Sequence, residues 1–545
     1  MNSFKRLLLI IVISLAPFVT IFATNLAPHT HDSPVHFARI AAYYKALSEG
    51  QILPRWAGEL NYGYGMPLFN FIYHVPYLVS SLAVALGSGL VLSFKISMAL
   101  CFVLSGVFMY LFALKFLKDE RRAMIAAILY LFAPFHLIDL VVRGDLAEGY
   151  ALAFLPLVLL SIVHSFEGKN KPLNILFISA ASTLLITSHN AISLVFFGII
   201  ALFVLVFAPN NAKRIEAIIG LTLGLMLSAF YWIPAIIERK YTYGDLFMKD
   251  MYKSHFAPFI HFFIPNLTNM EKLQTGGIAV SLGLVPVVGL VMGCIMFVKK
   301  RLRLIKEQKI FWFTLSLTIL ALYIMQPVSQ ILWESIPILR MFQFPWRLLN
   351  VTTFSLSLLG SIALVSTKTP RWLVLTIGAV AMLSTFVYFA PPLGQDPIDE
   401  KYYWNYPLNT TYFGETDIIW SEGPADSYPK NRFEVIGGDG IVTRGVKKGT
   451  EHTFTVVATS DVHVVDRTQY FPGWRVFNGN QKVPIEFQDQ NWRGLITFRL
   501  PPGTHDVRVE WGKSRVRQIA EGITIIGLCI SVVLIAGAYR KKHIA

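Results

Sequence analysis

The chain contains twelve apolar runs, each close to the roughly 20 residues that a helix needs to cross the hydrocarbon core of a membrane. Hydrophobic residues make up 54% of the sequence and charged residues only 15%, which argues against a soluble globular protein. We therefore expect a polytopic α-helical membrane protein. The expected spans lie near residues 6–24, 93–115, 122–140, 148–166, 173–189, 191–209, 214–233, 278–298, 310–326, 346–366, 371–390 and 519–539.

Basic residues between the runs predict the orientation of the spans. Lysines and arginines gather in alternate connections, and the positive-inside rule places such connections in the cytoplasm. We expect a cytoplasmic (inner) membrane protein with both termini in the cytoplasm. The net charge of +15 then reflects topology and contact with lipid headgroups, and no nucleic-acid partner is expected. The first run also has the shape of a signal peptide, but no small-residue cleavage pattern follows it, so we expect it to stay as a span.

The remaining polar segments predict the domain organisation. Residues 1–390 form the transmembrane domain, with a first outer loop over 25–92. Within that loop, residues 67–88 are apolar but carry prolines, so they predict a helix that lies in the outer interface or re-enters the membrane. Juxtamembrane helices of this kind are expected on the outer face.

A change of hydrophobic period after residue 390 predicts a second domain. Short runs such as Thr453–Val457, Leu495–Leu500 and Val507–Trp511 are separated by turn residues, and Asn478-Gly479 is a hairpin signal. We expect a small antiparallel β-sandwich over 434–514, outside the cytoplasm. Residues 391–433 form an irregular connection into it, and 515–545 form the last transmembrane helix and a cytoplasmic tail.

The first outer loop concentrates residues that carry chemistry, with Asp32 at their centre. Ser33 is suited to cap a helix that has Pro34 at its first position, and this places Asp32 at the positive end of the helix, next to His31. A helix N-terminus and nearby cations keep a carboxylate ionised, which suits a general base. An ordinary cap in a loop is the alternative. The same loop supplies His36, Arg39, Arg55 and Trp56.

A second candidate site is the turn between the third and fourth spans. Asp145 and Glu148 are three residues apart at the start of a helix, so their side chains face the same side. Arg143 before them has the fork geometry that binds a phosphate. Ionisable groups at a membrane boundary are costly unless they are solvated or used. Charge-paired capping of the helix is the alternative.

Two more polar sets lie at the same membrane boundary. Ser188-His189-Asn190 falls between the fifth and sixth spans, and Trp346-Arg347 precedes the tenth. A plain polar turn explains the first set, and an interfacial tryptophan with a snorkelling arginine explains the second. Taken together, an arginine-lined groove beside lipid suits a lipid-linked phosphate. Neighbouring carboxylates suit attack by an acceptor hydroxyl.

These segments also resemble a known family. The ordered set Leu53-Pro-Arg55-Trp56, Asn61-Tyr-Gly-Tyr-Gly65-Met-Pro67, Arg143-Gly-Asp145-Leu-Ala-Glu148, His189-Asn190 and Phe344-Pro-Trp-Arg347 is similar to bacterial and archaeal membrane proteins labelled 6-pyruvoyl-tetrahydropterin synthase-related, close to the YfhO-like proteins. Tyr470-Phe-Pro-Gly-Trp474 resembles the YfhO-like C-terminal domain. The label does not imply pterin chemistry, because nothing in the chain resembles a soluble zinc-dependent pterin enzyme.

The resemblance implies a GT-C-type fold, in which an integral membrane glycosyltransferase uses a polyprenyl-phosphate sugar and usually inverts the anomeric centre. Asp32 matches the catalytic aspartate of the first loop and Asp145 the second acidic position, which Glu148 assists. Many relatives of this fold carry a paired acid where this chain has His31-Asp32, so we expect a metal-independent site without a cofactor. A metal cluster of His31, Asp32 and His36 stays open.

The resulting prediction is transfer of a monosaccharide from a polyprenyl-phosphate carrier to a glycan, lipid or protein acceptor on the outer face. A lipid or polysaccharide transporter or flippase, and a non-catalytic envelope assembly protein, are the alternatives. The predicted catalytic residues are Asp32, Asp145 and Glu148, and the predicted substrate-binding residues are His31, His36, Arg39, Arg55, Trp56, Arg143, His189, Asn190, Trp346 and Arg347.

Overall fold

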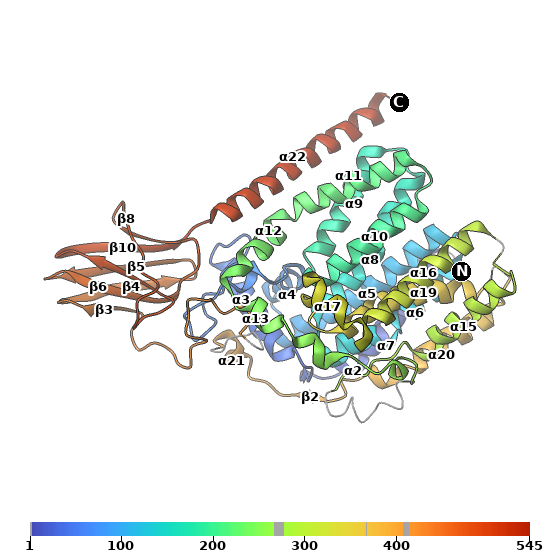
Figure 1. Ribbon diagram of the computed structural model, residues 1–545, viewed down its shortest axis with the longest axis horizontal. Coiled ribbons are helices and arrows are strands. Elements are labelled where there is room, and N and C mark those ends of the chain that lie inside the picture. Colours follow the sequence, from blue (N-terminus) through green and yellow to red (C-terminus); the bar gives the residue numbers. More distant parts are fainter. Residues whose placement is uncertain (1–2, 266–276, 303, 367, 407–413, 545) are drawn as a thin grey trace.

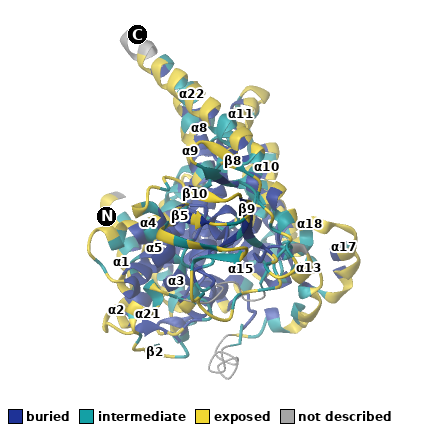
Figure 2. Cartoon of the chain, turned by 90° about the vertical axis from the view of Figure 1, so that its left-hand side faces the viewer, coloured by how far each residue is buried: buried dark blue, intermediate teal, exposed yellow. Residues whose placement is uncertain are grey.

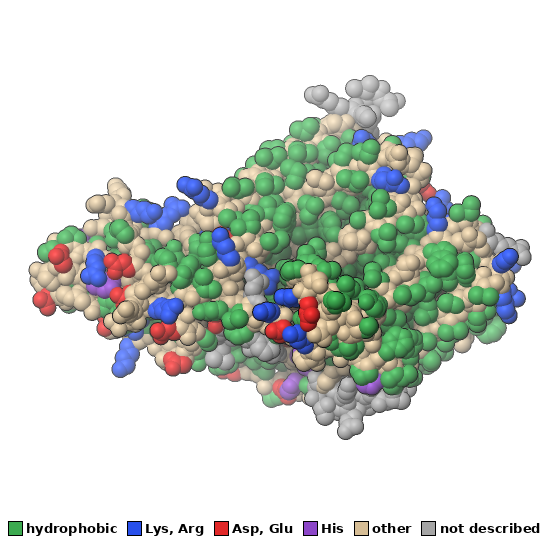
Figure 3. Space-filling view, viewed as in Figure 1, with side chains coloured by type: hydrophobic (Ala, Val, Ile, Leu, Met, Phe, Trp, Pro, Cys, Tyr) green, Lys and Arg blue, Asp and Glu red, His purple; other side chains and the backbone are tan. Residues whose placement is uncertain are grey.

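The computed structural model describes residues 3–265, 277–302, 304–366, 368–406 and 414–544. It is mostly helical, with a bundle of apolar helices, a β-domain at one end and a long C-terminal helix (Figure 1). Hydrophobic side chains cover much of the bundle surface, while charged side chains gather on and beside the β-domain (Figure 3). The bundle helices are α1 (Ser3–Leu15), α5 (Leu90–Leu117), α6 (Glu120–Leu131), α8 (Leu146–Glu167), α9 (Lys171–Ile186), α10 (Asn190–Phe207), α11 (Asn211–Leu227), α15 (Leu284–Val298), α16 (Ile305–Ile324), α19 (Leu349–Ala363), α20 (Arg371–Leu383) and α22 (Arg515–Ile544).

Helix α8 lies at the centre of the bundle. Its apolar window is 94% buried, and it packs against α5 and α9. A helix that is hydrophobic on all sides is stable only when other helices surround it. Because α8 begins directly after Asp145, this packing fixes the position of the acidic turn inside the protein.

Every predicted span falls on a helix, but the number of spans stays a prediction. In the described residues five helices are long and apolar enough to cross a membrane, or eight if each of three bent helix pairs counts as one span. The bends follow α6, α11 and α16, where short helices such as α7 (Pro134–Leu137), α12 (Ala229–Ile237) and α17 (Gln330–Ser335) continue at an angle. Helices α9, α15 and α20 are apolar but shorter than a full span.

Short elements lie between the spans. The first outer loop forms α3 (Ser33–Ser48), η2 (Leu68–Asn70) and α4 (Val75–Ala85), the last of which is the apolar helix expected within 67–88. The predicted cap of α3 is wrong by one residue. Asp32 takes the N-cap position and Ser33 is the first helical residue. The other short elements are α2 (Val19–Phe22), α13 (Gly244–Met248), α18 (Pro337–Arg340), η9 (Pro345–Leu348) and α21 (Glu400–Trp404).

The β-domain consists of two antiparallel sheets that share one hydrophobic core. One sheet has the order β4-β5-β10-β7-β8 and the other β3-β6-β9. Buried side chains of both sheets, such as Val456, Val464 and Phe498, form one cluster. The predicted hairpin at Asn478-Gly479 joins β7 to β8, whereas β3 and β4 were not predicted. The strands are β3 (Phe433–Gly437), β4 (Gly440–Lys448), β5 (Glu451–Ala458), β6 (Val462–Gln469), β7 (Trp474–Asn478), β8 (Gln481–Val483), β9 (Leu495–Leu500) and β10 (Gly503–Trp511).

The first outer loop supports the β-domain directly. Lys447 on β4 donates hydrogen bonds to the carbonyls of Gly58 (2.6 Å) and Gly63 (2.9 Å). Trp56 is buried in the hydrophobic cluster of the β-domain, where its ring lies 5.2 Å from that of Trp474. Gly65 has φ +75°, and a Cβ there would lie 2.7 Å from the Trp56 indole nitrogen, so only glycine fits this turn. The β-domain is therefore docked on the loop that carries Asp32.

Candidate functional site

Asp32 and the acidic turn before α8 lie side by side. The backbone N–H groups of His31 and Asp32 donate to the carbonyls of Val142 (3.1 Å) and Arg143 (2.8 Å). Gly144 follows in a left-handed conformation with φ +79°, and a Cβ at this position would lie 2.2 Å from the hydroxyl oxygen of Thr30. Only glycine allows this close approach. Two segments that are about 110 residues apart in the sequence thus form one site.

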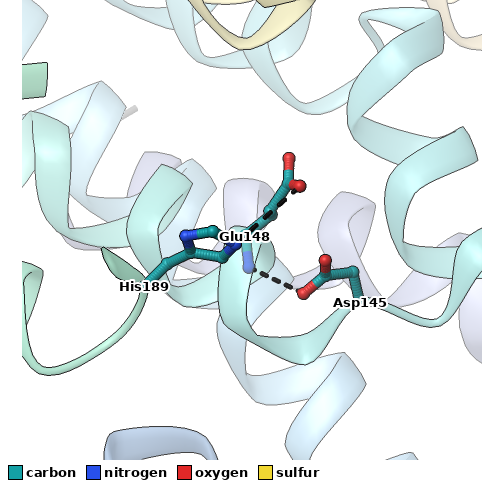
Figure 4. Close-up of side chains that lie close together, drawn as sticks. All are labelled: Asp145, Glu148 and His189. Atoms are coloured by element: carbon teal, nitrogen blue, oxygen red, sulfur yellow. Dashed lines mark hydrogen bonds and ion pairs between the residues drawn. The ribbon is translucent and has the colours of Figure 1, made fainter. Parts of the chain in front are cut away.

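Three of the predicted site residues occupy the N-cap positions of three helices. Asp32 precedes α3, Asp145 precedes α8 and His189 precedes α10. Asp145 accepts hydrogen bonds from the backbone N–H groups of Ala147 and Glu148, whereas the Asp32 side chain makes no capping bond. Figure 4 shows Asp145, Glu148 and His189 close together. Since each helix N-terminus carries a partial positive charge, this region favours anions.

Two arginines bind the carboxylates of this site. Arg143 pairs with Asp139, with Glu148 at 3.0 Å and with Asp145 at 3.1 Å. Arg347, from η9, pairs with Glu148 at 2.7 Å and lies 3.9 Å from Asp145. We call Asp139, Arg143, Asp145, Glu148 and Arg347 the acid–arginine cluster, and all five are buried. The guanidinium groups predicted to bind phosphate therefore already neutralise acids.

Asp139 was not predicted, because it lies inside an apolar run. It belongs to the π-helix η3 (Ile138–Arg143), and its Oδ2 atom is buried with no hydrogen-bond partner among the described residues. π-Helices are rare and are frequent at functional sites. The four-residue spacing from Arg143 was the available signal. With Asp139 the cluster has three acids for two arginines, and Asp32 is a fourth acid beside it.

The opposite wall of the site comes from α3 and α4. Asp32, His36 and Arg39 follow one another at four and three residues, so they share one face of α3. The Tyr77 hydroxyl lies 3.1 Å from His36 Nδ1 and accepts a hydrogen bond from Arg39 at 3.4 Å. Tyr77 was not predicted. Its spacing from the first-loop motif carried no signal that it would face Arg39.

Tyr73 joins this wall to the acid–arginine cluster. Its ring stacks on Tyr77 at 5.6 Å and on His189 at 5.6 Å, with interplanar angles of 9° and 19°. Tyr73 is only half-buried. Sequence reasoning also missed this residue, as well as Asn350, whose amide donates to Glu148 at 2.7 Å.

Burial sets the protonation of Asp32. Desolvation raises its pKa from 3.8 to about 6, and the opposing positive charge of Arg143 only limits the rise. The helix terminus and nearby cations were expected to keep this carboxylate ionised, and burial opposes their effect on its pKa. At neutral pH the carboxylate is still mostly ionised. A pKa near the working pH is the property of an effective general base.

Neighbouring groups are held in defined states. Burial alone would raise the pKa of Asp145, but Arg143, His189 and Arg347 together hold it well below its usual range. Burial lowers the pKa of His36 to about 3 and that of His189 to about 4, so both imidazoles are neutral at physiological pH. Of these four groups, Asp32 is the one whose pKa lies between pH 5 and 7.

The donor atoms fit a divalent cation poorly. Ligand atoms of Asp145, Glu148 and His189 lie within 4.8 Å of one another. His189 Nδ1, however, accepts a hydrogen bond from the Ile192 N–H, so the neutral ring carries its proton on Nε2, the atom that faces Glu148 at 4.0 Å. The two arginines occupy the carboxylates as well. In the described part of the chain, His31, Asp32 and His36 do not form a ligand group.

Other predicted residues lie around the cluster. Trp346 covers the guanidinium of Arg143, whose carbon lies 4.9 Å from the ring centroid, and stacks on Phe344 at 4.8 Å. Asn190 donates to the carbonyl of Phe71 at 2.8 Å and accepts from the Tyr231 hydroxyl, which ties α10 to the first loop. These residues shape the walls of the site.

The structure places Arg55 and Trp56 elsewhere. Arg55 donates to Asn70 at 3.1 Å and pairs with Glu521 of α22 at 3.4 Å. Asn70 donates to Glu238 at 2.8 Å, which Arg517 of α22 also binds at 3.3 Å. We call these five residues the junction network, because they join the first loop, α12 and α22. Trp56 fills the core of the β-domain.

Comparison with known proteins gives a family match and distant structural likenesses. The family model of the 6-pyruvoyl-tetrahydropterin synthase related domain, a membrane protein, matches residues 69–388. A protein of Lactococcus lactis subsp. cremoris (strain MG1363), named only as uncharacterized, is 26% identical over 227 aligned residues, and the match covers 38% of this chain and 36% of that protein. The chain thus covers about a third of that relative.

Solved structures of arabinofuranosyltransferase AftD from Mycobacteria match with a TM-score of 0.43 and 15–16% identity. They cover 73–75% of this chain, which spans only 27–28% of the AftD chain. A likeness at this level does not assign an activity. The family model and the apolar helices together establish a multi-pass membrane protein. The chain belongs to the 6-pyruvoyl-tetrahydropterin synthase related family of membrane proteins.

Proposed function

We propose that the protein is a membrane glycosyltransferase that moves a monosaccharide from a polyprenyl-phosphate carrier to an acceptor. One observation carries the proposal. Asp32, half-buried and with a pKa of about 6, is held by backbone hydrogen bonds beside Arg143, where three helix N-termini and two arginines meet. A general base next to an anion-binding environment is what attack on a phosphate-linked sugar requires.

Asp32 takes the proton of an acceptor hydroxyl. The hydroxyl oxygen then attacks the anomeric carbon while the bond from that carbon to the phosphate oxygen breaks. The leaving polyprenyl phosphate gains one negative charge, which positive groups already fixed in place stabilise without reorganisation. A single displacement of this kind inverts the anomeric centre. Arg39, on the same face of α3 as Asp32, is well placed to bind the phosphate together with Arg143.

Asp145 and Glu148 take a supporting role in this mechanism. They pair with Arg143 and Arg347, so they hold the guanidinium groups in place. His31, His36, His189, Asn190 and Trp346 line or support the walls. We propose that no metal takes part. Arginines pair with the carboxylate oxygens that would bind one, and His189 carries its proton on Nε2, the nitrogen that faces Glu148.

The acids of the site support an enzyme over a transporter. Asp32 and Asp145 cap helices, and Glu148 lies in the first turn of α8, so all three are at helix ends. A transporter is expected to use ionisable groups near the middle of the membrane, at the interface of structural repeats. We place the reaction on the outer face of the cytoplasmic membrane, with both termini inside, because the basic connections predict this orientation.

A sided vesicle assay tests the proposal. Purified protein is reconstituted with a radiolabelled undecaprenyl-phosphate sugar and an extract of cell-envelope acceptors. Transfer of the label to a water-soluble or higher-mass product, with release of undecaprenyl phosphate, is expected. Movement of intact donor between leaflets indicates a flippase, and retention of donor without either change indicates a non-catalytic assembly protein. Either of these results contradicts the proposal.

A further inference from the structure

The segment that connects the bundle to the β-domain carries a group of tyrosines. Tyr402 and Tyr403 lie on α21, and Tyr406 follows it. Tyr62 of the first loop and Tyr428, just before β3, complete the group, which we call the tyrosine patch. Tyr402 is 48% exposed and Tyr428 is 54% exposed. Figure 2, which views the molecule from the β-domain side, shows α21 at its edge.

The patch is a connected surface. Tyr403 and Tyr406 stack at 5.4 Å with an interplanar angle of 5°, and Tyr402 contacts both rings at 5.3–5.5 Å. Tyr62 contacts Tyr428 at 5.4 Å. The Tyr428 hydroxyl donates to the carbonyl of Asn405 at 2.9 Å, which joins the two halves.

The patch is fixed to the helix that begins at Asp32. Tyr403 packs against Phe37 at 5.4 Å, and its neighbour Trp404 packs against Tyr44 at 5.8 Å, both on α3. Glu400 accepts hydrogen bonds from the N–H groups of Leu90 (2.8 Å) and Val91 (3.0 Å) at the start of α5. Rings held by packing lose little entropy when they bind a ligand, which is the property of a binding surface.

The surroundings of the patch favour a hydrophilic partner. Exposed residues beside it carry both charges or are polar, and they include Asp399, Lys401, Asn405, Asp426 and Lys430. The exposed residues of α22, by contrast, are mainly Ile, Leu and Val, as expected for contact with lipid. Tyrosine offers a flat apolar face and a hydroxyl, so a row of tyrosines matches sugars, which present C–H faces and hydroxyl groups.

We propose that the tyrosine patch binds the acceptor and that this acceptor is a glycan chain. The inference rests on the proposed function, whose acceptor is a glycan, a lipid or a protein. It narrows these three acceptor classes to glycans. A glycan bound here lies along α3, whose N-terminal end carries the proposed base. The patch selects the acceptor, while the acid–arginine cluster binds the donor.

A glycan array tests the binding. Full-length protein in detergent is applied to oligosaccharides of different sugar composition, alongside the Tyr402→Ala/Tyr428→Ala double variant. We expect the wild-type protein to bind at least one glycan class. The affinity of the double variant for that class should be lower by about tenfold or more. Tyr402→Phe should retain most of the binding, because the ring is kept. Tyr539→Ala, a substitution of an exposed tyrosine on α22, is the matched control and should not change binding.

Three results would overturn the inference: no glycan bound by the wild-type protein, equal binding by the double variant, or an equal loss in Tyr402→Phe. Hydroxyl-radical footprinting in phosphatidylglycerol-containing nanodiscs separates glycan from lipid. Tyr402 and Tyr428 should be accessible without glycan and protected with it, whereas protection by lipid alone would make the patch a membrane anchor.

The inference and the proposed function fail separately. Binding is measured in the Asp32→Asn background as well, where it should be unchanged because Asp32 acts only on the bound hydroxyl. A protein that binds glycan through the patch but leaves the donor intact would contradict the proposed function alone. A double variant that transfers sugar at the wild-type rate at low acceptor concentration would contradict the inference alone.

Discussion

Two buried groups of arginines and acids differ in how their charges are matched. The junction network has two arginines, Arg55 and Arg517, and two glutamates, Glu238 and Glu521, with Asn70 between them. The acid–arginine cluster has three acids for two arginines, with Asp32 beside it. In the first, each glutamate pairs with an arginine, and Lys513 also pairs with Glu521. The second has surplus acid and a carboxylate of raised pKa.

We infer from this difference that the junction network stabilises the fold and that the acid–arginine cluster serves the chemistry. The junction network joins the first loop, the C-terminal end of α12 and α22, and so holds distant segments together. The acid–arginine cluster brings helix N-termini together and keeps Asp32 half-buried at a pKa of about 6. Perturbed pKa values of this kind gather at functional sites.

Glu238→Ala should have the largest effect, and on stability alone. Removing this carboxylate leaves the buried Arg517 without its partner, and losing one member of a buried ion pair costs about 3–5 kcal/mol. We expect a clear drop in the melting temperature and unchanged transfer activity per folded molecule. The Glu238→Met/Arg517→Met double variant should recover much of the stability. A loss of activity in folded Glu238→Ala would show that the junction network serves catalysis.

Trp56→Ala should loosen the β-domain. The indole is 1% exposed and packs on Trp474 and Trp511, so its removal leaves a cavity that costs about 3 kcal/mol. Hydrogen exchange should become faster in β5, β7 and β10 and stay unchanged in α8. If hydrogen exchange in these strands is unchanged and donor binding is weaker, Trp56 binds substrate, as the sequence predicted.

Arg347→Lys should reduce transfer about a hundredfold, mainly in kcat, because a lysine keeps the charge but loses the planar guanidinium that pairs with Glu148 and lies 3.9 Å from Asp145. The measurement is steady-state kinetics with the labelled donor. Arg499→Lys is the control, since Arg499 is exposed on β9 and pairs only with Glu486 among its described contacts. An Arg347→Lys protein with full kcat would show that Arg347 takes no part in transfer.

The pH dependence should follow Asp32. A base must be deprotonated to act, so kcat/KM should fall about tenfold per pH unit below pH 6 and level off above it. His36 and His189 do not contribute, because their pKa values of about 3 and 4 lie below this range. A flat rate between pH 4.5 and 8, as a transporter without a titrating group would show, contradicts the assignment.

On stability, Asp32→Asn should have the smallest effect, a gain at high pH. The pKa of Asp32 is higher in the folded state, so its protonated form contributes stability below pH 3.8 that is lost as the pH rises to about 6. Asparagine does not lose a proton. The melting temperature of Asp32→Asn relative to wild type should therefore increase between pH 4 and pH 7. An equal difference at both pH values would contradict the raised pKa.

The sequence predicted candidate site residues where polar segments meet helices. Asp145 and His189 stand directly before apolar helices and Asp32 directly before α3, and all three take N-cap positions, where side-chain chemistry is restricted. Asp139 stands inside an apolar run, where no local signal separates a site residue from a tolerated polar one. Tyr73 and Tyr77 depend on the packing of α3 against α4, which the chain pattern does not encode.

Local chemistry was also ambiguous in the first loop. Arg55 and Trp56 together match a substrate-binding pair, but the same pair suits a domain junction, and only the position of the β-domain separates the two uses. The number of spans could not be predicted for a similar reason. Apolar runs that contain bends have the composition of a straight span, and the three bent helix pairs are visible only in the structure.

Single-turnover transfer by Asp32→Asn tests the central claim most directly. Protein in excess over labelled undecaprenyl-phosphate sugar is mixed with acceptor, and free undecaprenyl phosphate is measured over time. We predict that wild type and the control Asp396→Asn, which changes an exposed acid near the same loop, react at the same rate. Asp32→Asn should react about 10²–10⁴-fold more slowly while keeping its fold. Release of undecaprenyl phosphate by Asp32→Asn at the wild-type rate would contradict the account.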